Sequence, residues 1–98
     1  MKVTEIRETE HFSRFLRALR DERARARIQI RIHRLRLGLV GDARSVGGGV
    51  FELRVDYGPG YRVYFSRRGA GLVILLAGGD KGSQDRVIAL ARVLARAV

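Results

Sequence analysis

The stretch FELRVDYGPGYRVYFSRRGAGLVILLAGGDK, residues 51–81, decides the fold of this 98-residue chain. Hydrophobic and polar residues alternate over 51–57 and again over 61–66, which predicts two β-strands with one hydrophobic face each. The intervening Gly-Pro-Gly at 58–60 predicts a turn, because glycine accepts positive φ and proline fixes one dihedral angle. After a second turn, residues 72–77 are hydrophobic on both faces, which predicts a strand in the middle of a sheet.

The polar residues of the first two strands are predicted to share the face opposite the core. A three-residue loop would pair Tyr57 with Tyr61, so that polar positions meet polar positions across the two strands. The resulting charged, solvent-facing floor would contain Glu52, Arg54, Asp56, Arg62 and Tyr64. Two arginines near one turn can bracket a phosphate with bidentate contacts. A tyrosine opposite Arg54 can stack on an unpaired base, which makes Tyr64 a candidate RNA-binding residue.

The N-terminal half predicts a short strand at residues 2–7 and two helices. Thr9 is available to cap a first helix that reaches Arg20, and Asp21 can cap a second. The segment RARARIQIRIHRLRLGLVG fits both a strand and a helix, but the helix gathers its arginines into one stripe. These candidate RNA-binding residues are Arg23, Arg27, Arg31 and Arg34. The helical interpretation leaves Ile30 and Leu37 off the main hydrophobic face, where a bound partner could cover them.

The remaining segments complete a single predicted domain over residues 1–98. GDARSVGGG, at 41–49, is predicted to be a flexible connection because it is rich in glycine. Ser83 can cap a last helix whose hydrophobic stripe runs from Val87 to Val98. The predicted order is β-α-α-β-β-β-α, an α+β domain with helices packed on one side of a mainly antiparallel sheet.

Composition narrows the function classes. Twenty Lys and Arg against ten Asp and Glu give a net charge of +10, and all but two of the basic residues are arginine. Such a surface favours a polyanionic partner, although a high arginine count also fits a GC-rich genome. The absence of cysteine excludes disulfides and thiolate metal sites. No signal-peptide core or membrane-spanning run is visible, so we expect a cytoplasmic protein without a membrane partner.

The charged face has the residue types that RNA cleavage without a metal or cofactor requires. The reaction needs a base for the 2′-hydroxyl proton, cations for the charge on phosphorus and a donor for the leaving 5′-oxygen. Glu52 or Asp80 is the candidate base, Arg54 and Arg62 are candidates to stabilise the transition state, and Lys81 is the candidate donor. A sheet face of alternating charges is also common as a plain solvated surface.

VFELRVDYGPGYRVYF followed by LLAGGDKGSQ resembles the RelE/ParE toxin superfamily of bacterial type II toxin–antitoxin systems, and within it the HigB-like addiction module killer branch. The resemblance covers nearly the whole chain. It implies a RelE-like, microbial-RNase-type fold. The implied activity is endoribonucleolytic cleavage of mRNA on the ribosome, with Arg54, Arg62 and Lys81 at the positions of the family's basic site residues. RelE-type enzymes carry additional lysines where Glu52 stands and an aromatic residue in the last helix, near Val87.

The resemblance also implies partners and leaves two other activities open. A cognate antitoxin would hold the toxin inactive and bind DNA through a helix-turn-helix, so that this chain reaches DNA only through its antitoxin. ParE toxins share the fold but inhibit DNA gyrase and are not nucleases, and a degenerate relative would only bind its antitoxin and DNA. Fold alone does not choose among these activities.

Overall fold

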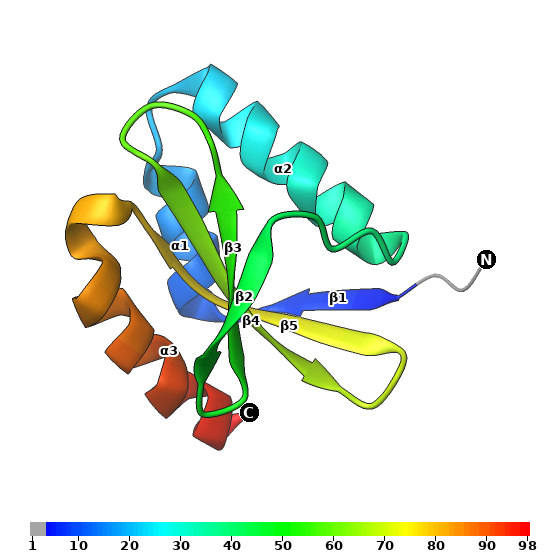
Figure 1. Cartoon of the computed structure of the whole chain (residues 1–98). Helices are drawn as coiled ribbons and strands as arrows, with labels where there is room; N and C mark the ends of the chain where they lie inside the picture. The colour runs from blue at the N-terminus through cyan, green and yellow to red at the C-terminus, as the bar shows by residue number, and fades with distance from the viewer. Residues whose placement is uncertain (1–3) are drawn as a thin grey trace.

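A five-stranded sheet forms the centre of the computed structural model, which describes residues 4–98 and has an α+β fold with three α-helices (Figure 1). Along the chain the elements are β1 (Glu5–Glu8), α1 (Glu10–Ala18), α2 (Glu22–Arg36), β2 (Ala43–Gly47), β3 (Val50–Val55), β4 (Tyr61–Arg68), β5 (Leu72–Gly79), the 3₁₀ turn η1 (Lys81–Ser83) and α3 (Gln84–Ala97). The strand predicted at 2–7 is represented by β1, and residues 1–3 lie outside the described part.

The sheet is mixed, with the strand order β1-β5-β4-β3-β2. β1 pairs with β5 in parallel, and the other neighbours are antiparallel. β5 therefore has a neighbour on each side, as its continuous hydrophobic run predicted. No helix within residues 4–98 is long and apolar enough to cross a membrane.

Helices cover both faces of the sheet, so the prediction of helices on one side is wrong. α1 and α2 pack against one face, where a hydrophobic cluster includes Phe12, Ile28 and Leu53. α3 packs against the other face, where a second cluster includes Tyr64 and Val87. Figure 1 shows α2 and α3 on opposite sides of the sheet. The face predicted to be a solvated charged floor is thus largely the floor of a second core.

The predicted starts of α1 and α2 are confirmed. The side chain of Thr9 accepts a hydrogen bond from the backbone N–H of Phe12 at 3.2 Å, and Asp21 accepts from Arg23 N–H at 3.0 Å and from Ala24 N–H. Each cap satisfies N–H groups that lack a partner inside the helix. The arginine-rich segment is helical over α2, as its arginine spacing predicted.

The glycine-rich segment after α2 is a strand rather than a flexible connection, so that prediction is wrong. β2 pairs with β3, and Arg44 lies opposite Glu52 in the ladder. Gly47, Gly48 and Gly49 all have positive φ and form the tight turn into β3. The segment was missed because these turn glycines dominate its composition, while a single β-branched residue, Val46, lies within the strand.

Candidate functional site

The β3–β4 hairpin brings its two arginines face to face. Arg54 pairs with Arg62, whereas Tyr64 pairs with Glu52. The prediction that Tyr64 lies opposite Arg54 is therefore wrong: five residues, 56–60, connect the two strands instead of three. A shift of two residues leaves every side chain on its predicted face, since the side-chain period of a strand is two.

Arg54, Arg62 and Lys81 line one hollow of about 500 Å³, so the structure brings the three predicted basic residues together. β5 runs antiparallel to β4 and places Gly79 opposite Arg62. The chain then turns, and the backbone N–H of Lys81 lies 3.4 Å from the carbonyl of Pro59 in the hairpin turn. The remaining lining residues are Asp42, Asp56, Gly58, Pro59 and Gly60.

Arg62 is the most firmly held of the three cations. Its side chain is 12% exposed, and Nη1 donates to the backbone carbonyls of Gly60 at 3.1 Å and Tyr61 at 3.3 Å. Gly60 has a φ of +79°, and a Cβ there would lie 3.4 Å from both Arg62 and Lys81. Glycine is therefore favoured here by the positive φ of the turn, since the added Cβ would make only ordinary contacts with the two basic side chains.

Arg54 is more exposed than Arg62 and is paired with an acid that sequence reasoning did not single out. Its Nε and Nη2 donate to Oδ1 of Asp42 at 3.1 and 2.6 Å, and its side chain is 44% exposed. Such exposed pairs contribute little to stability, about 0–1 kcal/mol. An anionic ligand can therefore compete with Asp42 for the guanidinium at low cost.

Glu52 lies beneath the hollow, fully buried, and does not line it. Its carboxylate accepts hydrogen bonds from Arg44 Nε at 2.9 Å, the Tyr64 hydroxyl at 2.9 Å and Gln84 Nε2 at 2.7 Å. Arg62 Nε is buried, has no hydrogen-bond partner among residues 4–98, and lies 3.9 Å from Oε2 of Glu52. The carboxylate thus connects β2, β3, β4 and α3 directly under the candidate site.

The network keeps Glu52 ionised. Burial raises the pKa of Glu52, but the hydrogen bonds from Arg44, Tyr64 and Gln84 outweigh burial and leave the pKa below its ordinary value of 4.5. Burial and the hydrogen bond to Glu52 raise the pKa of Tyr64, so this phenol stays protonated. Three hydrogen bonds to a carboxylate stabilise its charged form, so this carboxylate is a poor acceptor for a further proton.

Tyr64 is fully buried in the cluster under α3, so the predicted exposure of its ring is wrong. In this conformation the ring has no face to offer an RNA base. The alternating pattern correctly placed Tyr64 on the face opposite the main core. It contained no information about α3 covering that face.

Asp80 caps the η1 turn and does not line the hollow. Its carboxylate accepts from the backbone N–H of Ser83 at 3.0 Å, and the Ser83 hydroxyl accepts from the backbone N–H of Asp80 at 3.1 Å. The prediction that Ser83 caps α3 through its side chain is wrong, because that hydroxyl belongs to this reciprocal capping box. Asp80 fixes the turn that carries Lys81.

Two acidic residues, Asp42 and Asp56, line the hollow. Asp42 is engaged by Arg54, whereas the carboxylate of Asp56 is exposed and has no hydrogen-bond partner among residues 4–98. Asp56 belonged to the predicted charged face, and the structure places it in the hollow with the two arginines, but the sequence did not single it out as a candidate base. Among residues 4–98, no three His, Asp or Glu side chains come together as metal ligands would.

The four stripe arginines of α2 have different environments. Arg31 donates through Nη1 to the carbonyl of Arg54, and Arg27 lies over the ring of Tyr57 at 4.8 Å from its centroid. Arg27, Arg31 and Arg34 line a further hollow of about 330 Å³ together with Ile30, Val55 and Asp56. Arg23 is exposed and lies outside that hollow.

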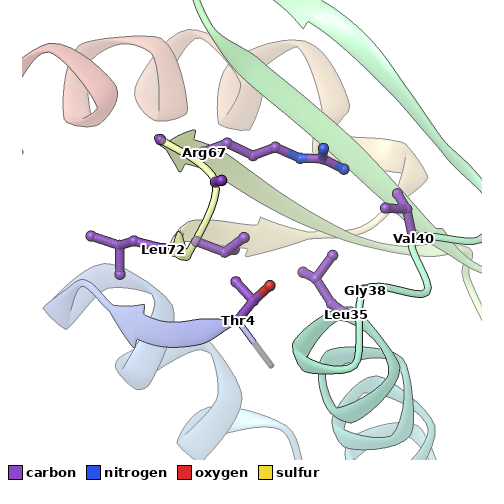
Figure 2. Close-up of a pocket in the computed structure, with 9 residues that line it drawn as sticks. Thr4, Leu35, Gly38, Val40, Arg67 and Leu72 are labelled. Atoms are coloured by element: carbon purple, nitrogen blue, oxygen red, sulfur yellow. The ribbon is translucent and has the colours of Figure 1, made fainter. Parts of the chain in front are cut away.

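A smaller hollow of about 280 Å³ lies where the C-terminal end of α2 meets the β4–β5 turn (Figure 2). Figure 2 shows the side chain of Arg67 extended across it toward Val40, with Thr4 and Leu35 below. The lining is otherwise mainly hydrophobic, and the guanidinium of Arg67 lies over the ring of Phe51. None of the predicted site residues lines this hollow, so it is not the candidate site.

The chain matches no model of a known protein family. It is 49% identical over 92 residues to an uncharacterized protein from Haemophilus influenzae, which covers 94% of this chain and 93% of that protein. The chain therefore belongs to the same family as this H. influenzae protein.

Proposed function

We propose that this protein is the toxin of a type II toxin–antitoxin module and cleaves mRNA on the ribosome. The observation that carries the proposal is the convergence of Arg54, Arg62 and Lys81 in one open hollow. Three cations at one position are costly to the folded chain because they repel one another. They are suited to binding the charge of a phosphodiester and of its transition state.

The chemistry assigns a role to each side of the hollow. The 2′-oxygen of the substrate attacks phosphorus, the bond from phosphorus to the 5′-oxygen breaks, and the products are a 2′,3′-cyclic phosphate and a 5′-hydroxyl. Arg54 and Arg62 stabilise the negative charge on the non-bridging oxygens, and Lys81 donates a proton to the leaving 5′-oxygen. Asp56 accepts the proton of the 2′-hydroxyl, because Glu52 and Asp80 are committed to structural hydrogen bonds.

The proposal extends to fold family and partners. The α+β order, with β2 added, is compatible with a RelE-like, microbial-RNase-type fold of the HigB-like branch. The proposed partners are mRNA, the ribosome and a cognate antitoxin that carries the DNA-binding function, and the proposed site of action is the cytoplasm. The net charge of +10 supports a polyanionic target.

One observation favours a second candidate, a ParE-like inhibitor of DNA gyrase. Both acids that the sequence suggested as the catalytic base, Glu52 and Asp80, have structural roles, and a gyrase inhibitor needs no base. In that case the basic hollow would bind an acidic surface of its target rather than RNA.

Induced expression without antitoxin, followed by mapping of mRNA 5′-ends and of gyrase-trapped DNA breaks, separates the two candidates. We expect codon-phased mRNA cuts for the natural chain and none for Arg62→Ala. Arg96→Ala is a matched control, because it removes an exposed arginine from the last turn of α3 and should leave the cuts unchanged. DNA breaks with intact transcripts would support the gyrase inhibitor and contradict the nuclease.

A further inference from the structure

The hollow that contains Arg54, Arg62 and Lys81 adjoins the hollow on α2. Asp56 lines both, so one side chain forms part of the wall between them. The first hollow lies on the same sheet face as α3, beyond the part that α3 covers. The second hollow lies beside Val55, on the opposite face, which α2 covers. A ligand that occupies both must pass around the β3 edge at Asp56.

On its β2 side, this end of β3 has no neighbouring strand, because β2 begins at Ala43, opposite Leu53, whereas β4 still pairs with Arg54 and Val55 on the other side. The backbone groups of Arg54 are satisfied in another way: its N–H donates to the carbonyl of Asp42 at 3.0 Å, and its carbonyl accepts from Arg31. The Arg31 side chain therefore binds the backbone of Arg54, a residue of the first hollow, and also lines the second hollow. It fixes α2 against β3 and sets the relative position of the two basic surfaces.

The second hollow has the charge and shape of a binding surface for single-stranded RNA. Arg27 and Arg34 lie one turn before and one turn after Arg31, and neither guanidinium donates a hydrogen bond to another group among residues 4–98. Ile30, which is 53% exposed, lies between them and provides an apolar surface next to the two guanidinium groups. Cationic groups beside an apolar surface suit a phosphate backbone with its sugars and bases.

We propose that the hollow formed by Arg27, Ile30, Arg31 and Arg34 is a second RNA subsite, which binds the nucleotides next to the phosphodiester held by Arg54, Arg62 and Lys81. The inference rests on the proposed function. The carboxylate of Asp56 repels phosphates, so the strand places a phosphate on each side of it and a ribose hydroxyl beside it. DNA lacks that 2′-hydroxyl, and the arrangement therefore favours RNA.

The test compares binding of a short and a long natural RNA oligonucleotide, about three and about eight nucleotides in length, without ribosomes, on which the proposed cleavage depends. The double variant Arg27→Ala/Arg34→Ala should bind the long RNA more weakly and the short RNA unchanged. For the long RNA, the slope of the logarithm of the binding constant against the logarithm of the salt concentration should decrease in magnitude by about 1.4. Each lost phosphate contact on a single strand removes about 0.7 from this slope.

Arg23→Ala is the matched control, because Arg23 belongs to the same arginine stripe and helix but lies outside the hollow. Because its side chain does not line the hollow, it should weaken binding of the long RNA much less than the double variant does. Equal losses for Arg23→Ala and the double variant would overturn the subsite, because they would indicate a general effect of positive charge. Unfolding temperatures of all variants verify that the fold is intact.

Arg62→Ala separates the failure of this inference from the failure of the proposed function. If Arg62→Ala weakens both RNAs and the double variant weakens neither, the second subsite is wrong and the first hollow stands. If Arg62→Ala weakens neither RNA, the proposed function fails as well. Loss of binding to a glutamate-rich peptide, with RNA binding intact in the double variant, would overturn the subsite and assign this surface to an acidic protein partner.

Discussion

The hollow and the buried network beneath it are built from alternate residues of the same two strands, yet they have opposite properties. Arg54 and Arg62 lie near the hairpin turn and line an open hollow, whereas Glu52 and Tyr64, two residues farther along each strand, are fully buried. The difference arises from α3, which packs over Tyr64 but does not extend over Arg54. Polar residues of one strand face can therefore serve binding or structure, depending on which element covers them.

The largest expected effect is a loss of stability when the buried network around Glu52 is disrupted. Glu52→Ala leaves the Tyr64 hydroxyl and the Gln84 amide without their acceptor and removes the negative charge beside Arg62, whose side chain is only 12% exposed. We expect a loss of about 3–5 kcal/mol in the free energy of unfolding, which is the usual cost of removing one member of a buried charge pair. Urea denaturation measures it, and a loss below about 1 kcal/mol, the value of an exposed pair, would contradict the structural role.

The next largest effect is a loss of cleavage rate when a residue of the open hollow is changed and the core is left intact. Asp56→Asn removes the proposed base while keeping its shape, and we expect mRNA cleavage to slow by about 100-fold or more. Since Asp56 is exposed, the free energy of unfolding should change by less than about 0.5 kcal/mol. Single-turnover cleavage on the ribosome measures the rate. Asp42→Asn is the control, and a greater loss of rate in that variant would assign the base to Asp42.

A smaller effect sharpens the boundary between the two regions. Tyr64→Phe removes only the hydroxyl that donates to Glu52, so we expect a loss of about 1–2 kcal/mol in stability. RNA affinity should stay unchanged, because the ring is buried. Measuring both quantities on one preparation distinguishes a core tyrosine from a stacking platform. A loss of affinity with unchanged stability would restore Tyr64 as an RNA-binding residue.

The smallest effect is seen in acid. The pKa of Glu52 is below its ordinary value of 4.5, so the folded state binds its proton more weakly than the unfolded chain does. Its contribution to stability is present above the unfolded pKa and is lost as the pH falls through the folded pKa. Glu52→Gln should therefore show a weaker loss of stability in this acid range. Urea denaturation from about pH 6 to about pH 3 provides the test, and parallel curves for both proteins would contradict it.

How far the sequence predicts this molecule depends on whether a pattern is local. The helix starts at Thr9 and Asp21 and the helical stripe of α2 follow from neighbouring residues, and all were predicted correctly. The hairpin faces also follow from alternation. The register was wrong by two residues because Tyr57 leaves the ladder, and its hydroxyl lies within hydrogen-bonding distance of Asp21, which is distant in the chain.

The site was predictable in its cations and not in its acids. Arg54, Arg62 and Lys81 follow from strand pairing and from the family resemblance, and the structure brings them together. The roles of Glu52 and Asp80 could not be read from the sequence, since burial and capping depend on α3 and on the turn before it. The Gln84 side chain gave no signal at all, because only the packed helix brings it to Glu52.

The most direct measurement is an NMR titration of the ¹⁵N-labelled protein with a non-cleavable RNA trinucleotide. The central claim is that Arg54, Arg62 and Lys81 bind one phosphodiester together. It predicts that the side-chain Nε–H signals of Arg54 and Arg62 and the backbone signal of Lys81 shift together, with one common dissociation constant. Shifts confined to other arginines, with these three signals unmoved, would contradict it.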